Sequence, residues 1–183
     1  MSSKLNVSEI IIGHFKTLSN SQGEIVKTDI FVFYIIPVLF AVFSIYSSCN
    51  LQKDISALLV NFGAIFTALL LSVLVLVYDQ ESKIEQIRSS DSLYPVKKRL
   101  LRDLYYNISY SILSSIFLVL LCFIHRVVDG LSSQIHMFSF YFEFKYDVFL
   151  ATPLVVFITT NIFLNIIMVV KRMHVLLTTH HNV

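Results

Sequence analysis

Side chains that could do chemistry are spread along this chain and form no known catalytic pattern. The sequence has no HExxH or CxxC motif, no glycine-rich phosphate loop and no pair of carboxylates. We therefore expect neither an enzyme nor a bound cofactor or metal. Three histidines near the end of the chain are of a type that binds metal, but a solvated terminus explains them more simply: His174, His180 and His181.

Amide and hydroxyl side chains occur inside stretches that otherwise contain no Asp, Glu, Lys or Arg. Their spacing of about four residues places them on single helix faces. Such groups either form hydrogen bonds between packed helices or line a pore at the axis of an oligomer, and the sequence leaves both interpretations open. The residues concerned are Asn61, Asn107, Ser111, Ser115, Asn161 and Asn165.

Small residues and prolines mark further positions in the same stretches. Asn61 is followed by a row of small residues that permits close contact with another helix: Ala64, Ala68 and Ser72. Pro37 and Pro153 have no N–H to donate. Each is therefore expected to kink its helix and to free the carbonyl four residues before it, at Phe33 and Phe149 respectively.

The elements that must position these side chains are membrane-spanning helices. The 183 residues are 56% hydrophobic and only 14% charged, with a mean hydropathy of +0.74, which is too apolar for a soluble domain of this size. A spanning helix needs about 20 mostly apolar residues. Four stretches qualify, and they predict an all-α four-helix transmembrane bundle over residues 30–170: 30–48, 55–78, 107–125 and 148–170.

The distribution of basic residues predicts which side of the membrane each connection faces. Eleven of the 14 Lys and Arg residues lie in three segments: 1–29, 79–106 and 171–183. The positive-inside rule places these segments in the cytoplasm and the loop 126–147 outside. An even number of spans requires both termini to share a side, which agrees. We expect a multi-pass protein of the bacterial inner membrane with cytoplasmic termini.

The N-terminal segment contains a predicted amphipathic helix over residues 7–18. Apolar residues recur there at helical spacing: Val7, Ile10, Ile11, Phe15 and Leu18. We expect this helix to lie on the inner membrane surface, with packing against the cytoplasmic loop as the alternative.

The loop 79–106 is expected to be a helical hairpin that projects into the cytoplasm, because both of its flanks continue the neighbouring spans without a helix breaker. Its turn should lie near residues 89–92. Acidic residues on the descending arm, such as Glu85, are expected to pair with basic residues on the returning arm. That basic arm is a candidate surface for anionic lipid or for a cytosolic protein: Lys97, Lys98, Arg99 and Arg102.

The outer loop has a strand pattern over residues 134–146, with aromatic residues at every second position. One strand alone leaves its backbone unpaired, and three arrangements are open. The strand pairs with its copy in a neighbouring subunit, lays its Phe row on the lipid interface, or folds back as an irregular hairpin. The row consists of Phe138, Phe140, Phe142 and Phe144.

The size of the chain, its four spans, its cytoplasmic termini and its basic middle loop resemble the small membrane subunit of the bacterial Kiwa anti-phage defence system. The resemblance covers the whole chain and concerns its architecture. It implies an inner-membrane oligomer that works with a cytosolic, DNA-binding companion.

Two functions follow from the sequence. The first is a self-associating membrane anchor or sensor scaffold that recruits a cytosolic protein and contacts membrane lipid but no nucleic acid directly. The alternative is a small pore-former or channel that alters membrane permeability.

Overall fold

The computed structural model describes residues 7–18, 27–86, 93–137 and 140–181. Its core is four helical segments that are each long and apolar enough to cross a membrane, which confirms the four predicted spans. The first segment joins α2 (Lys27–Ile30), a π-helical turn η1 (Phe31–Ile35) and α3 (Ile36–Tyr46). The others are α4 (Lys53–Gln86), α5 (Tyr94–Val128), and the π-helical turn η2 (Asp147–Ala151) continuing into α6 (Thr152–His181).

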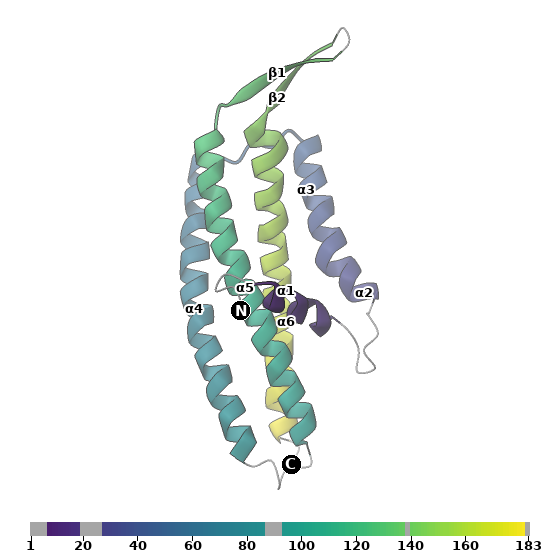
Figure 1. Ribbon diagram of the computed structural model, residues 1–183, viewed down its shortest axis with the longest axis vertical. Coiled ribbons are helices and arrows are strands. Elements are labelled where there is room, and N and C mark those ends of the chain that lie inside the picture. The colour runs from purple at the N-terminus through teal and green to yellow at the C-terminus, as the bar shows by residue number, and fades with distance from the viewer. Residues whose placement is uncertain (1–6, 19–26, 87–92, 138–139, 182–183) are drawn as a thin grey trace, which may run out of the picture.

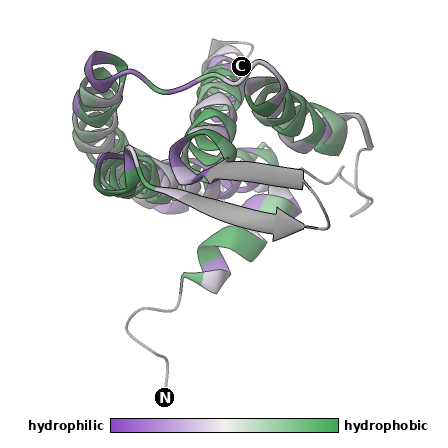
Figure 2. Ribbon diagram, turned by 90° about the horizontal axis from the view of Figure 1, so that it is seen from above, coloured by the Kyte–Doolittle hydropathy of each residue, from purple (hydrophilic) through white to green (hydrophobic). Residues whose placement is uncertain are grey.

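The helices pack as a row in which α4 contacts α5, α5 contacts α6, and α6 contacts α3 (Figure 1). Small residues set the close approach of α4 and α5, since a Cβ on Gly63 would lie 2.8 Å from Val119 Cγ2. Large apolar side chains such as Phe43, Phe123 and Ile167 remain more than half exposed. Figure 2 shows the mainly apolar colouring of the four long helices, and these outward side chains are the surface that lipid would cover.

Both π-helical turns come just before a proline. Pro37 follows η1 and Pro153 follows η2 by two residues. Proline cannot donate the backbone hydrogen bond that an α-helix requires at its position, and a single π-helical turn is one way to absorb the defect. The irregularity expected in the helix at each of these two prolines is therefore a single, wider π-helical turn.

Three of the helices are much longer than a membrane is thick. α4 has 34 residues and α5 has 35, which is about 50 Å at 1.5 Å per residue, against about 30 Å for the hydrocarbon core. The predicted helical arms of the 79–106 loop are present up to Gln86 and from Tyr94, with Pro95 in the first turn of α5. The turn expected near residues 89–92 lies outside the described residues. We call the part built from residues 79–86, 94–106 and 171–181 the extension.

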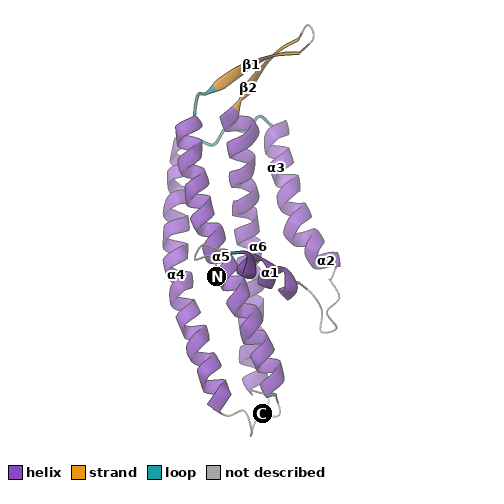
Figure 3. Ribbon diagram, in the orientation of Figure 1, coloured by secondary structure: helices purple, strands orange, loops and turns teal. Residues whose placement is uncertain are grey.

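The end of the bundle opposite the extension carries a β-hairpin (Figure 3). Strand β1 (Ser132–Met137) pairs antiparallel with β2 (Phe140–Lys145), with Ser132 opposite Lys145 and Met137 opposite Phe140. Of the three arrangements left open for this segment, the chain forms the hairpin, in which β1 is the backbone partner of β2. The single strand expected over residues 134–146 is therefore two strands. We call this end of the bundle the hairpin end.

Candidate functional site

A short helix lies across the middle of the bundle, near the level at which the first span begins (Figure 1). This helix, α1 (Ser8–Thr17), packs against α5. Its buried face consists of Gly13, His14 and Thr17, whereas Ile12 and Phe15 are about half exposed. The helix predicted for residues 7–18 is confirmed, but the face turned toward the bundle is its small and polar one.

A buried hydrogen-bonded cluster fixes α1 to α5. His14 Nδ1 lies 2.9 Å from Asn107 Oδ1, and Thr17 Oγ1 lies 2.8 Å from the same oxygen. The Thr17 hydroxyl is also 2.7 Å from the His14 carbonyl oxygen. The imidazole stacks on the Tyr110 ring with 3.9 Å between ring centroids and 4° between ring planes. Side chains separated by 93 residues in the chain are thereby held in one place.

Arg172 extends the cluster to a third helix. From α6, its guanidinium donates a hydrogen bond of 2.7 Å to the Thr17 carbonyl, which lies at the end of α1. It also forms an ion pair with Asp103 on α5, at 3.6 Å. A cation at the C-terminus of a helix interacts favourably with the helix dipole. We call the five residues His14, Thr17, Asp103, Asn107 and Arg172 the α1 node.

Burial decides the charge state of His14 in the α1 node. It lowers the pKa of His14 to about 4; the nearby Arg172 guanidinium acts in the same direction, and the hydrogen bond that His14 makes to Asn107 Oδ1 acts in the opposite direction. The ring is therefore neutral at pH 7. With Nδ1 as the donor to Asn107 Oδ1, Nε2 carries a lone pair and has no partner among the described residues. The node is suited to holding a helix, and among the described residues no group of three His, Cys, Asp or Glu could hold a metal.

The predicted polar residues of the fourth span form a bridge between helices. Asn161 Nδ2 donates to the Phe33 carbonyl at 3.0 Å, and Asn165 Nδ2 donates to Asn161 Oδ1 and to its carbonyl, both at 3.0 Å. Both side chains are fully buried within a single chain. The Asn pair therefore takes part in hydrogen bonding between packed helices, and within this single chain it has no exposure to an aqueous path.

The other polar residues predicted to act inside the spans lie at three separate places. Asn107 belongs to the α1 node. Ser111 and Ser115 are buried in α5, where the Ser115 hydroxyl donates to the Ser111 carbonyl at 2.8 Å. Asn61 is exposed on α4, and no hydrogen bond joins its amide to another described residue. The predicted set therefore does not converge on one site.

The four basic candidates of the extension differ in exposure and in partners. Lys97 is buried, which contradicts its place on a docking surface. Lys98 forms an ion pair with Glu85 on α4 and a 3.1 Å hydrogen bond with the Tyr94 hydroxyl, so the predicted pairing between the two arms is confirmed at this position. Arg99 is partly exposed and Arg102 is exposed. Arg102 therefore remains as the exposed member of the four-residue docking surface that the sequence predicts.

The aromatic row of the outer loop is only partly described. Phe140 pairs with Met137, Phe142 with Ile135 and Phe144 with Ser133 through the backbone. Phe138 lies outside the described residues, and the side-chain surroundings of the row are not described. The oligomer contact expected through these residues stays a prediction.

Sequence reasoning missed His14 and Thr17. The sequence places the apolar stripe of residues 7–18 on the membrane surface, and its Val7 and Phe15 are exposed, but it assigns no role to the opposite face of the helix. One signal was present: Gly13, His14 and Thr17 interrupt the apolar pattern on a common face.

Comparison with family models, with curated proteins and with solved structures finds no match to this chain.

Proposed function

We propose that this chain is an oligomeric inner-membrane anchor or sensor scaffold that recruits a cytosolic protein through its extension. The observation that carries the proposal is the extension itself. The three helices of the extension continue for about 12 to 20 Å at 1.5 Å per residue, and a scaffold needs such a rigid platform outside the membrane.

The hydrophobic core of the bundle continues into the extension, which supports its role as a platform. Leu101 and Leu104 of α5 are almost fully buried and pack with Val77 of α4, and Met173 and Leu176 of α6 pack against this cluster. The Lys98–Glu85 and Arg172–Asp103 ion pairs link the same helices at the surface. A pore-forming peptide has no need for this packed and charge-paired extension.

The distribution of charge supports a cytoplasmic location for the extension and for both termini. The basic residues near membrane ends gather on the side of the extension, as the positive-inside rule requires. In this orientation, the β-hairpin faces the periplasm and α1 lies at the cytoplasmic interface, where its exposed Ile12 and Phe15 meet lipid.

Self-association is supported by an outward face of α4. Asn61, Ala64, Ala68 and Ser72 are all exposed and recur on one side of the helix. Small residues allow two helices to approach closely, and an amide in a membrane gains from a partner on the neighbouring helix. A second copy of the chain is the partner that we propose for this face, which we call the α4 seam.

The cytosolic partner is proposed to dock on the part of the extension where α5 meets α6. Arg102 and Lys171 are exposed there, and each directly precedes one member of the Asp103–Arg172 ion pair in the sequence. Among the described residues, neither forms an ion pair of its own. An acidic surface of a cytosolic protein is the complementary partner. A role in bacterial anti-phage defence rests on the architectural resemblance alone.

The alternative function, a pore, predicts that the Asn161–Asn165 pair conducts. Its hydrogen bonds to Phe33 and within α6 give it a structural role that needs no pore, so the scaffold is the better-supported proposal.

The test of the scaffold is charge reversal at the proposed docking surface. Arg102→Glu combined with Lys171→Glu should abolish crosslinking to one identifiable cytosolic protein in native cells, with membrane insertion and oligomer mass unchanged. Lys53→Glu, an exposed charge at the hairpin end, is the matched control and should leave the partner bound.

A different result would favour the pore. Asn161→Leu with Asn165→Leu would then abolish the permeability change, measured with a membrane-potential dye, and the charge-reversed variant would depolarise cells normally. If the charge-reversed variant retains every crosslink of the wild type, the scaffold proposal is wrong.

A further inference from the structure

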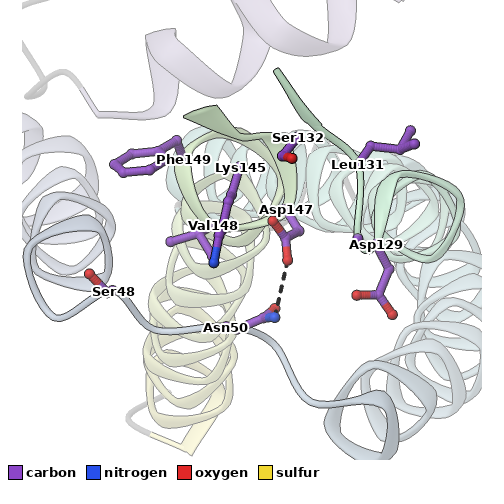
Figure 4. A pocket seen from close by; sticks show the side chains of 10 residues that line it. Ser48, Asn50, Asp129, Leu131, Ser132, Lys145, Asp147, Val148 and Phe149 are labelled. Carbon is purple, nitrogen blue, oxygen red and sulfur yellow. Dashed lines mark hydrogen bonds between the residues drawn. The ribbon is translucent and has the colours of Figure 1, made fainter. Parts of the chain in front are cut away.

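The hairpin end contains a polar cavity of about 600 Å³ that the proposed scaffold function does not use. Three parts of the chain enclose it: the connection between α3 and α4, the turn from α5 into β1, and the passage from β2 into η2 (Figure 4). The cavity lining includes Asn50, Asp129, Ser132, Lys145, Asp147 and Phe149.

Charges of both signs face this cavity. Asp147 is only 5% exposed, and Asn50 Nδ2 donates to its Oδ2 at 3.1 Å. Asp129 forms a long ion pair with Arg126, at 3.9 Å. Lys145 is exposed, and among the described residues it forms no ion pair with either carboxylate. In Figure 4 the Lys145 ammonium and the Asp147 and Asp129 carboxylates lie around the segment that carries Asn50.

The helix ends next to the cavity hold polar groups without partners. His125, in the last turn of α5, is 1% exposed, and neither ring nitrogen has a hydrogen-bond partner among the described residues. Thr152, the first residue of α6, is 2% exposed, and its hydroxyl also lacks a partner there. Buried polar groups are nearly always satisfied in proteins. Neither residue lines the cavity, so the groups available to a ligand are those of the lining itself.

The arrangement of charges selects a zwitterion. A ligand with only a negative charge would meet the carboxylates of Asp147 and Asp129. A ligand with only a positive charge would meet the like charge of the Lys145 ammonium in the same cavity. A primary ammonium can donate up to three hydrogen bonds to the carboxylates, while a phosphate accepts from Lys145 and from the Ser132 hydroxyl.

The position of the cavity selects a lipid as the source of that zwitterion. The cavity lies at the end of four membrane spans, which is where phospholipid headgroups lie. Phe149 contributes an apolar wall, and the next residue, Leu150, is 55% exposed on the outside of the bundle. An acyl chain can follow that apolar surface while its headgroup occupies the polar cavity.

We propose that this cavity binds the headgroup of an aminophospholipid such as phosphatidylethanolamine. Its ammonium lies against Asp147 and Asp129, and its phosphate lies against Lys145 and Ser132. A bound headgroup links the base of the β-hairpin to the α3–α4 connection. Choline lipids bind less well, because a quaternary ammonium has no N–H to donate.

Native mass spectrometry of the full chain, delipidated and then exposed to one lipid at a time, tests this proposal. We expect at least fivefold more retained phosphatidylethanolamine than phosphatidylcholine or phosphatidylglycerol.

Lys145→Gln and Asp147→Asn should each reduce the retention of phosphatidylethanolamine to the phosphatidylglycerol level. Asp147→Asn keeps the shape of the side chain, and Lys145→Gln changes an exposed residue, so neither should unfold the protein. Lys53→Gln, exposed at the same end and outside the cavity lining, is the control and should bind as the wild type does.

A second arm separates a lipid from a soluble source of the same headgroup. Glycerophosphoethanolamine is added to the delipidated protein and its binding is measured by calorimetry. If it binds while phosphatidylethanolamine is not retained, the lipid proposal is overturned. Equal retention of the three lipids, or full retention by both Lys145→Gln and Asp147→Asn, also overturns it.

Discussion

Asn161 of α6 donates a hydrogen bond of 3.0 Å to the backbone carbonyl of Phe33 in the first span. That carbonyl is the one left without its usual helical donor by Pro37, four residues later. A defect in one helix is thus satisfied by a side chain of its neighbour, and the site is fully buried. In a membrane, where water cannot take the place of a missing donor, this contact fixes how the first and fourth spans pair.

Asn161→Leu should destabilise the bundle, because it removes the donor to Phe33 and leaves a buried carbonyl without that partner. A loss of about 1–2 kcal/mol is the scale for such a bond between membrane helices, measured by unfolding in mixed detergent micelles. Thr160→Val is the matched control, because within the described part of the chain the Thr160 hydroxyl bonds only to Val156 of its own helix. Adding Pro37→Ala restores a backbone N–H at position 37, so the cost of Asn161→Leu should shrink in that background. An unchanged cost would show that Pro37 is not the cause.

The sequence predicted the parts of this fold that depend on local properties. Four spans follow from apolar length, and the carbonyl freed at Phe33 follows from the chemistry of Pro37. The partner of that carbonyl could not be predicted, because nothing in the sequence pairs residue 33 with residue 161.

Two other features escaped prediction for different physical reasons. α1 turns its polar face inward, because the apolar side of an interfacial helix is stabilised by lipid and the usual rule of apolar residues inside no longer applies. The β-hairpin stayed one of three open arrangements, because residues 138–139 are Phe and Ser and form none of the dipeptides that mark a two-residue hairpin turn, such as Asn-Gly or Asp-Gly.

Gly13→Ala should release α1 from the bundle. A Cβ at this position would overlap the ring of Tyr106, so either the ring or α1 must shift. Faster hydrogen exchange across residues 8–17 would report the release. Tyr106→Ala in the same chain removes the clash and should restore slow exchange. If Gly13→Ala alone exchanges as slowly as the wild type, α1 does not pack against Tyr106 as described.

Bulky residues on the α4 seam should reduce self-association. Ala64→Phe with Ala68→Phe prevents the close approach that small residues allow, so the oligomer mass in mild detergent should fall to that of the 21.0 kDa monomer. Ile167→Phe, on an exposed face of α6, is the control and should leave the mass unchanged. An oligomer that survives both seam substitutions must use another surface.

The orientation in the membrane is tested with reporter fusions. A reporter after Val183 or near Ser90 should be active only as a cytoplasmic protein, and one near Ser133 only as a periplasmic protein, because 11 of the 14 basic residues lie on the first side. A periplasmic signal near Ser90 would reverse the proposed topology and remove the docking surface from the cytosol.

The binding of α1 to the bundle should weaken as the pH falls below 7. In the docked helix, burial lowers the pKa of His14 to about 4, whereas a released helix has the ordinary value of 6.5. Between these values the released state binds more protons than the docked state, so docking is stable above pH 6.5 and is progressively lost as the pH falls toward 4. The opening equilibrium should rise about twentyfold from pH 7 to pH 5 by this linkage.

The opening equilibrium is measured as hydrogen exchange of residues 8–17, corrected for the intrinsic rate at each pH. His14→Gln keeps an amide for Asn107 but cannot titrate, and its opening should not change with pH in this way. His174→Gln alters an exposed histidine and should behave as the wild type. If His14→Gln retains the full pH dependence, the proton that releases α1 binds elsewhere.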